Sequence, residues 1–569
     1  MTSRLRSWAM TAIAGALAAC AAPPLQPDLQ ATAPKLEGFG QIDLPITTGS
    51  AKARAHFNAG MLQAYAFNER EAVRQFKAAL AADPACALCA WGVAWQLGPI
   101  INRPERGDLR EAQRYVDLAL RLAGAQPAVT ASERQWIGAM ALRYGHESTA
   151  KEAAPLQAQI CRSSGGGSTR HPLDRAYADR LRELLLKSPQ DADLLTLWVE
   201  AEIVATPGDW YDDSTGAPQG RFAEMADRLE QLLQTRSTHT GLNHYLIHVV
   251  DHRQHAHRAV AAADRLGALA PNAPHLVHMP AHTYAHVGRY ADATRVNQQA
   301  VALDETLAAT LKAQGFANTG VWTYHNLHFQ WFGALMEGRG ELALSSARQL
   351  ATMAANWRGP YGEYVRSLPV LTLLRLQRWE ALASEAAASG EIGLAQALHA
   401  HAQAIAQLRR GNLAAGREQL AAVANANGRL ARAHAGATGF DATVRAIGDG
   451  AVASLQAEIA LAERQPDAAR AYARRAAELA RKADDSEPPM LGAGGDWALG
   501  DLLLRAGRAG EAEATFRGDL ERWPMSGWSL AGLAQALQAQ GRGGDASAVQ
   551  GLLAQAWPLA DAALVKASR

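Results

Sequence analysis

Small and apolar residues recur along the chain at the spacing that a pair of packed helices requires. Gly60, Ala72, Phe76, Ala79 and Pro84 form one such set. Small residues let two helices approach closely, and proline ends the second helix because it donates no helix hydrogen bond. Further sets are Ala259, Ala263, Leu266 and Pro271; Ala281, Tyr284, Ala293, Asn297 and Ala300; Gly500, Ala512, Phe516 and Pro524; and Ala534, Leu537 and Gly541. The pattern predicts stacked helix hairpins of about 34 residues.

This spacing resembles the tetratricopeptide repeat, so the predicted fold class is all-α, an α-solenoid of tetratricopeptide-type hairpins. We expect N-terminal hairpins in 51–145, central repeats in 146–350 and tetratricopeptide-like repeats in 351–569. Abundant alanine and few β-branched runs favour helix throughout. Four stretches do not fit the spacing and are expected to be insertions or long loops: 100–110, 145–172, 206–221 and 306–322.

The first fifty residues predict export. Arg4 and Arg6 precede a short apolar stretch that ends on Leu17-Ala18-Ala19-Cys20. The stretch is too short for a membrane-spanning helix, which indicates a cleaved signal in 1–19. Small residues before a cysteine resemble the bacterial lipobox, which implies lipidation of Cys20 and an anchor in the outer membrane, facing the periplasm. Residues 20–50 have no periodicity and are expected to be a tether.

Charge and cysteine content narrow the possible partners. The chain of 569 residues carries 56 Lys and Arg against 55 Asp and Glu, a formal net charge of +1. This balance argues against nucleic acid as a partner. Four cysteines are too few for a disulfide framework. Cys86 and Cys89 form a C-x-x-C pair, for which an oxidising periplasm favours a local disulfide or two buried thiols.

Histidines are concentrated and phased in the central repeats. Of 18 histidines, 12 lie within 239–328. If Ala259 and Ala293 are position 20 of successive hairpins, both hairpins have histidine at positions 5, 9 and 13: His244, His248 and His252, then His278, His282 and His286. If Ala343 is position 20 of the next hairpin, His325 and His328 occupy positions 2 and 5. Tetratricopeptide grooves are lined by these positions of the first helix, so the phasing predicts a column of imidazoles on the concave wall.

A column of this kind suits a transition metal. Residues i and i+4 share a helix face, which makes each pair of histidines at positions 5 and 9 a potential two-nitrogen ligand. The candidate ligands are His244, His248, Asp251, His278, His282, His325 and His328. Glu200, Tyr245 and Tyr324 are candidates to lie behind these ligands and orient them. Without a thiolate, the set favours Cu, Zn or Fe over Ca or Mg and does not select among the three.

Other interpretations of the same residues stay open. A tetratricopeptide groove ordinarily takes an extended peptide, and a histidine-rich wall suits that role through hydrogen bonds alone. His257, His275 and His286 are expected to be polar lining rather than ligands. Pro280 lies between His278 and His282 and should start or kink the helix there.

The longer motifs resemble a family of bacterial tetratricopeptide lipoproteins without a settled function. They are F-N-A-G-M to G-P-I-I-N-R-P over 57–104, N-H-Y-L-I-H at 243–248, H-L-V-H-M-P-A-H-T-Y at 275–284, and H-N-L-H-F at 325–329. The resemblance implies the solenoid and a shared histidine-lined groove, and it implies no substrate.

Three functions therefore remain. The first is an envelope protein that binds a transition metal in the groove. The second is a metalloenzyme, either a hydrolase or a copper or iron oxidase, because Asp251, Glu200, Tyr245 and Tyr324 are acid and base candidates. The third is a scaffold that binds a protein or peptide partner without metal.

Overall fold

A computed structural model shows a chain built from helix hairpins. It describes residues 25–103, 106–146, 171–206, 208, 210–212, 215–317, 322–433 and 440–567. Within those ranges, the extended pairing is confined to two isolated bridges, Ile100 with Arg103 and Tyr211 with Pro218. The predicted signal in 1–19 and the lipidation site Cys20 lie outside the described residues.

The helices follow one another with short connections. The first half comprises α1 Ala51–Tyr65, α2 Glu69–Ala82, α3 Ala87–Leu97, α4 Arg110–Ala125, α5 Ala131–Arg143, α7 Pro172–Lys187, α8 Ala192–Ala205, α9 Phe222–Leu233, α10 Thr240–Val249, the 3₁₀ helix Ala256–Ala259, α11 Val260–Leu269, α12 Pro274–His278, α13 Pro280–His286, α14 Tyr290–Ala313 and α15 Thr323–Met336. The second half comprises α16 Gly340–Met353, α17 Gly359–Arg375, α18 Trp379–Ser384, α19 Leu394–Arg409, α20 Leu413–Ala433, α21 Phe440–Ala462, α22 Pro466–Ala483, α23 Gly495–Arg505, α24 Ala509–Arg522, α25 Gly527–Ala539, α26 Gly543–Ala556 and α27 Ala562–Ala567.

Glycines at the predicted small positions explain how the hairpins pack. A Cβ added to Gly60 would come within 2.6 Å of the buried Phe76 ring, and one added to Gly92 within 2.5 Å. Phe76 of α2 therefore fits between α1 and α3 only because both helices have glycine there. Phe516 has the same relation to Gly500 and Gly532, at 2.4 and 2.3 Å. Together with sequential packing of neighbouring helices, this confirms an all-α solenoid of tetratricopeptide-type hairpins.

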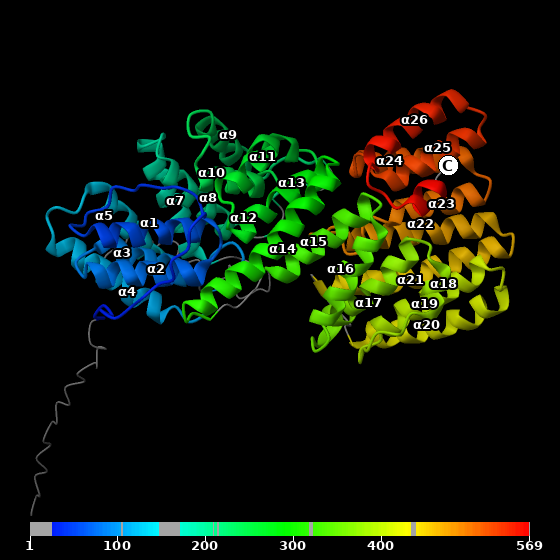
Figure 1. Ribbon diagram of the computed structural model, residues 1–569, viewed down its shortest axis with the longest axis horizontal. Helices are drawn as coiled ribbons and strands as arrows, with labels where there is room; N and C mark the ends of the chain where they lie inside the picture. Colours follow the sequence, from blue (N-terminus) through cyan, green and yellow to red (C-terminus); the bar gives the residue numbers. More distant parts are fainter. Residues whose placement is uncertain are drawn as a thin grey trace, which may run out of the picture.

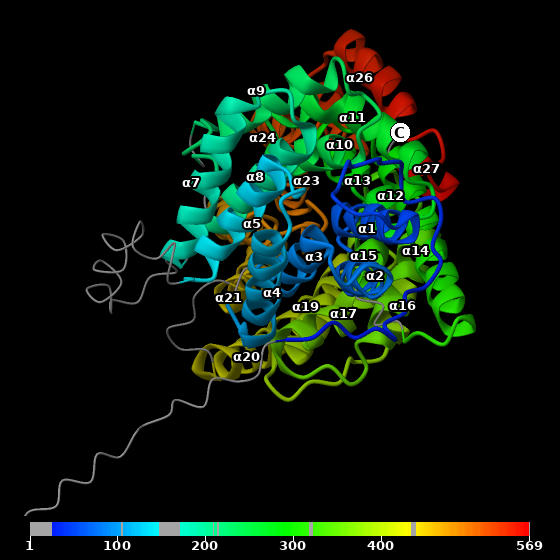
Figure 2. The same ribbon diagram turned by 90° about the vertical axis from the view of Figure 1, so that its left-hand side faces the viewer.

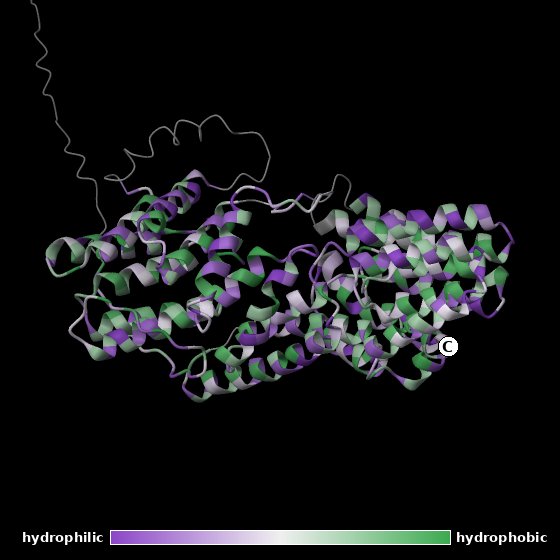
Figure 3. Ribbon diagram, turned by 90° about the horizontal axis from the view of Figure 1, so that it is seen from above, coloured by the Kyte–Doolittle hydropathy of each residue, from purple (hydrophilic) through white to green (hydrophobic). Residues whose placement is uncertain are grey.

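The solenoid has two lobes. Figure 1 shows the N-terminal lobe in blue to green and the C-terminal lobe in yellow-green to red. Each lobe has its own apolar cluster, and the two clusters meet in residues 285–331. Polar and apolar residues alternate along most helices (Figure 3), as hairpins with one buried face require. The N-terminal lobe also curls on itself, so that α1 packs against α10 (Figure 2).

Two expectations from the sequence are corrected. The tether predicted in 20–50 packs on the solenoid from Pro34 onward, because Phe39 and Ile46 are buried and Thr47 donates to Glu133. The loop predicted in 306–322 begins later, since α14 runs to Ala313 without interruption.

The C-x-x-C pair forms a disulfide between Cys86 and Cys89 at the start of α3. Of the helices that the structure describes, none has the length and apolar character that a membrane crossing requires.

Candidate metal centre

Three consecutive first helices of hairpins supply the histidines. They are α10, the α12–α13 pair and α15. Pro280 has no amide hydrogen to donate, and the helix is divided at Met279 into α12 and α13, as the sequence predicts. The division leaves His278 and His282 facing each other, with their Nε2 atoms 3.1 Å apart.

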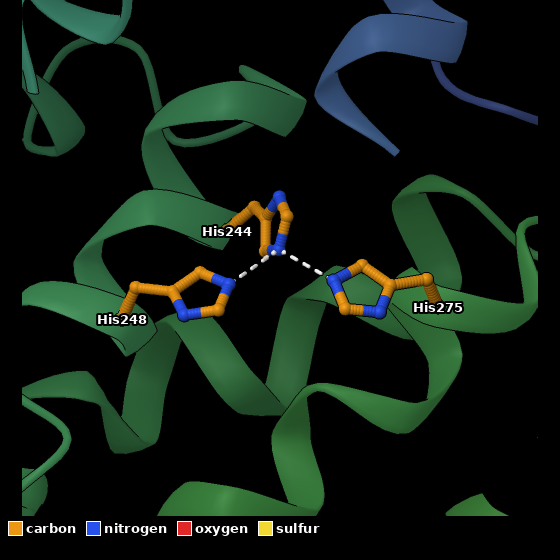
Figure 4. A group of neighbouring side chains, drawn as sticks. All are labelled: His244, His248 and His275. Atoms are coloured by element: carbon orange, nitrogen blue, oxygen red, sulfur yellow. Dashed lines mark hydrogen bonds between the residues drawn. The ribbon is translucent and has the colours of Figure 1, made fainter. Parts of the chain in front are cut away.

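The first triad consists of His244, His248 and His275 (Figure 4). His244 Nε2 lies 3.1 Å from His248 Nε2 and 3.1 Å from His275 Nε2. Two nitrogen ligands of a tetrahedral ion with bonds of about 2.0 Å stand roughly 3.3 Å apart. The three Nε2 atoms therefore converge at the separation that one shared ion requires.

The residues around the first triad are mainly apolar. His244 Nδ1 donates to the Tyr65 carbonyl oxygen at 2.7 Å, which leaves a single lone pair on its Nε2. Phe67 stacks on His248 and His275, with ring centroids 5.4 and 4.9 Å apart. Burial lowers the pKa of all three histidines, that of His248 to about 4. The triad is therefore neutral at physiological pH, the form that coordinates a metal.

Phe67 occupies a position where other hairpins have glycine. Its φ of 51° is left-handed, and it stands two residues before its second helix. The equivalent turn residue is glycine in five hairpins: Gly288, Gly338, Gly411, Gly507 and Gly541. A side chain in this conformation costs about 1 kcal/mol. The packing of Phe67 over the first triad is the compensation that the structure shows.

The second triad consists of His278, His282 and His325. His278 Nδ1 donates to Asn297 Oδ1 at 2.6 Å, and the Asn297 amide nitrogen donates to the Ala293 carbonyl, which fixes its orientation. His282 Nδ1 donates to Asp251 Oδ2 at 2.8 Å. Both histidines therefore point an Nε2 lone pair at the other across 3.1 Å. That arrangement requires a cation between them, either a proton or a metal ion.

Carboxylates give the second triad a different electrostatic setting. Burial opposes a charge on His282, but Asp251 and Glu487 outweigh it and raise the His282 pKa to about 10. Burial would also raise the pKa of Asp251, but His282 and His286 hold it well below its usual value. Burial lowers the pKa of His278 to about 3 and that of His325 well below its usual value. In the metal-free protein, one proton on His282 is the cation that this triad holds.

A cavity of about 460 Å³ opens beside the second triad. Its lining includes Asp251 and His282 from the N-terminal lobe, and Glu487 and Trp523 from the C-terminal lobe. Glu487 lies between α22 and α23, and its carboxylate is 3.2 Å from His282 Nδ1. The second triad therefore has access to solvent through a space between the lobes.

The two triads repeat one another along the solenoid. Counting from Ala259 and Ala293, each triad consists of positions 5 and 9 of one hairpin and position 2 of the next. The two sets are adjacent, since the rings of His275 and His278 lie 6.0 Å apart. His275 is the ligand candidate that the sequence argument left out, although it shares position 2 with His325.

Four other predicted residues lie elsewhere or play other parts. His328 is separated from both triads, which corrects the predicted ligand set: its nitrogens face the hydroxyls of Tyr364 at 2.9 Å and Tyr324 at 3.2 Å. Tyr324 therefore orients His328 rather than a triad histidine. Glu200 accepts from the Trp95 indole at 2.7 Å, and burial raises its pKa to about 7. Tyr245 packs its ring 5.3 Å from that of His244.

No protein-family model and no curated protein sequence matches the chain. Among solved structures it is similar to yeast Tom70, with 12% identity, a TM-score of 0.24, and coverage of 88% of this chain and 91% of that one. For human IFIT1 the values are 11%, 0.30, 90% and 91%. For Cut9–Hcn1 of the APC/C they are 12%, 0.25, 91% and 90%. At such TM-scores the paths of the chains differ, and the fold rests on this chain's own hairpins.

Proposed function

We propose that the protein binds a transition metal ion at each histidine triad. The observation that carries this proposal is the orientation of the imidazoles. His244, His278 and His282 each commit Nδ1 to an oxygen acceptor, so each presents an Nε2 lone pair to another imidazole. Histidine ligands of protein-bound metals are commonly fixed by such a bond to a carbonyl or carboxylate.

The donor set favours Zn²⁺, Cu²⁺ or Fe²⁺. Imidazole nitrogens suit these ions, whereas Mg²⁺ and Ca²⁺ prefer oxygen. Three imidazoles also leave one coordination position open to water or a ligand. We further propose that the ions are held in the cell envelope, on a protein anchored to the outer membrane through Cys20; this part rests on the sequence alone.

The test is the metal content of protein purified without a histidine tag. After dialysis against Zn²⁺ or Cu²⁺ at pH 7.5, we expect two equivalents per chain. His399→Ala is the matched control, since His399 is partly buried on α19 and bonds only the Glu385 carbonyl among its described partners; it should retain both. Wild type without bound metal would leave a surface for a protein partner as the better interpretation of the solenoid.

Metal-dependent catalysis is a second candidate that the cavity favours. The cavity reaches His282 and Asp251, so a small substrate could approach the second triad beside a carboxylate. Metal-loaded protein would then hydrolyse a chromogenic ester or consume O₂ with an organic reductant. His282→Ala should lose that activity and His399→Ala should keep it. If neither reaction exceeds that of the free metal ion, the protein is a binding protein.

A further inference from the structure

A second cavity lies in the C-terminal lobe, away from the histidine triads. It has a volume of about 200 Å³ and is enclosed by α17, α19, α21, α22 and α23, which lie together in Figure 1. Its walls are mainly apolar, with Leu371, Ile405, Ile447, Ala477 and Leu502 among them. An apolar cavity of 150 Å³ is already large enough to hold benzene.

Arg375 brings a buried charge to this cavity. The residue is 7% exposed, and none of its three guanidinium nitrogens has a hydrogen-bond partner among the described residues. Its guanidinium lies 4.1 Å from the ring centre of Trp497 and 4.5 Å from that of Trp528. Aromatic rings attract a cation through their faces, but they leave the hydrogen-bond donors of the guanidinium unused.

The nearby acidic groups are committed elsewhere. Asp484 accepts from the Leu491 amide at 2.7 Å, and Asp519 accepts from the Ser529 hydroxyl. The other charged residues that line the cavity pair with one another. Arg409 lies 3.2 Å from Glu458 and 3.0 Å from Asp501. Among the described residues of this cavity, Arg375 is the cation without a counter-ion.

Arg143 shows how the same chain treats a buried arginine without a ligand. Arg143 is 2% exposed, and its Nε donates to Asp174 at 2.9 Å while Nη2 donates to the Pro99 carbonyl at 2.6 Å. A buried charge is tolerated when it is paired in this way and is strongly unfavourable when it is not. Arg375 breaks this rule, and the missing partner is an anion in the cavity.

His401 adds a second unpartnered polar group. It is 6% exposed, lines the same cavity, and has no hydrogen-bond partner for either ring nitrogen among the described residues. Burial lowers its pKa to about 4, so the imidazole is neutral at pH 7. Burial also lowers the Arg375 pKa, to about 9, which leaves the guanidinium charged. The cavity therefore offers one positive charge, one neutral donor and an apolar body.

We propose that this cavity binds a small amphipathic monocarboxylic acid, with its carboxylate on the edge of Arg375 and its apolar part against the aliphatic walls. A carboxylate matches the planar donors of a guanidinium through two parallel hydrogen bonds. One unpaired positive charge calls for one negative charge, which disfavours a phosphate dianion. His401 donates to the same ligand, and the volume suits a body of about one aromatic ring.

The test measures binding of 3-phenylpropionate and hexanoate to the full chain by calorimetry. Both acids should bind, whereas neutral 3-phenylpropionamide should bind at least about tenfold more weakly, because charged hydrogen bonds are lost. Arg375→Met should abolish acid binding. Arg410→Gln, an exposed arginine beyond the end of α19, should leave it unchanged. His401→Asn should weaken it by a smaller factor.

Thermal unfolding separates this site from a structural arginine. If Arg375 lacks a partner in the free protein, Arg375→Met should raise the melting temperature without ligand, because it replaces an unpaired buried charge by an apolar side chain. The proposal is overturned if wild type binds neither acid, if the amide binds as tightly as the acid, or if Arg375→Met binds the acids normally. A loss of melting temperature in Arg375→Met would also overturn it, since it would show a structural partner.

Discussion

The two histidine triads share one geometry and differ in the groups behind it. Both consist of positions 5, 9 and 2 of successive hairpins, with Nε2 atoms 3.1 Å apart. Behind the first triad are a carbonyl oxygen and the ring of Phe67. Behind the second are Asp251, Asn297 and Glu487. The repeat thus duplicates the arrangement of ligands, while residues outside the repeat pattern determine the charge.

This difference predicts how protons compete with metal. The first triad has lowered pKa values throughout, so it carries no proton to displace near pH 7. In the second, His282 has a raised pKa of about 10 and is protonated at pH 7. Its proton must leave before Nε2 can bind a metal. An ion in the first triad is therefore retained to lower pH than one in the second.

The largest expected effect is the loss of one ion when one triad is broken. We expect His248→Ala to remove only the first ion and His282→Ala to remove only the second, because three imidazoles are needed for tight binding. The double variant should bind none. Metal content after dialysis measures this, and circular dichroism should show unchanged helix, since solenoid stability is a sum of local terms. Joint loss of both ions in either single variant would show one shared centre.

The next effect is the pH dependence of the remaining ion. In His248→Ala, affinity of the second triad should rise about tenfold per pH unit between pH 6 and 9, because one proton leaves His282. In His282→Ala, affinity of the first triad should be flat over the same range. Competition with a chelator of known affinity at each pH measures both. Equal slopes would contradict the assignment of the displaced proton to His282.

A smaller effect should follow from removing the carboxylate behind His282. Asp251→Ala should weaken binding at the second triad about 10- to 100-fold, the range known for groups that orient a histidine ligand. Binding at the first triad should not change. Asp264→Ala is the matched control, because Asp264 pairs with Arg289 and Tyr284 and contacts no triad histidine in the described structure. Equal losses in the two variants would remove the special role of Asp251.

Much of the fold could be predicted from residues that are close in sequence. Gly60 and Phe76 belong to one hairpin, and their spacing alone indicates two helices in close contact. The histidine column also follows from the phase of one repeat. His275 could have been included, since it shares position 2 with His325; the argument from i, i+4 pairs missed it because it has no such partner.

The groups behind the histidines could not be predicted. The Tyr65 carbonyl reaches His244 from 179 residues away, because the N-terminal lobe curls until α1 meets α10. Glu487 reaches His282 from the other lobe. Both contacts depend on the cumulative rotation from one hairpin to the next, which repeat spacing does not contain. His328 was included by its position, and its tyrosine partners from α17 were equally hidden.

Glu487 provides the finest test of the comparison, because it acts on the second triad from a half-exposed position. Glu487→Gln removes a charge 3.2 Å from His282 Nδ1, but solvent screens an exposed carboxylate, so we expect a change in affinity of only about two- to threefold. The change should shrink further in 1 M salt, where screening acts within about 3 Å. Glu478→Gln, an exposed carboxylate on α22 that pairs with Arg475, controls for net charge. If both variants shift the second triad equally, Glu487 contributes only to the general field, and the second triad then differs from the first through Asp251 and Asn297 alone.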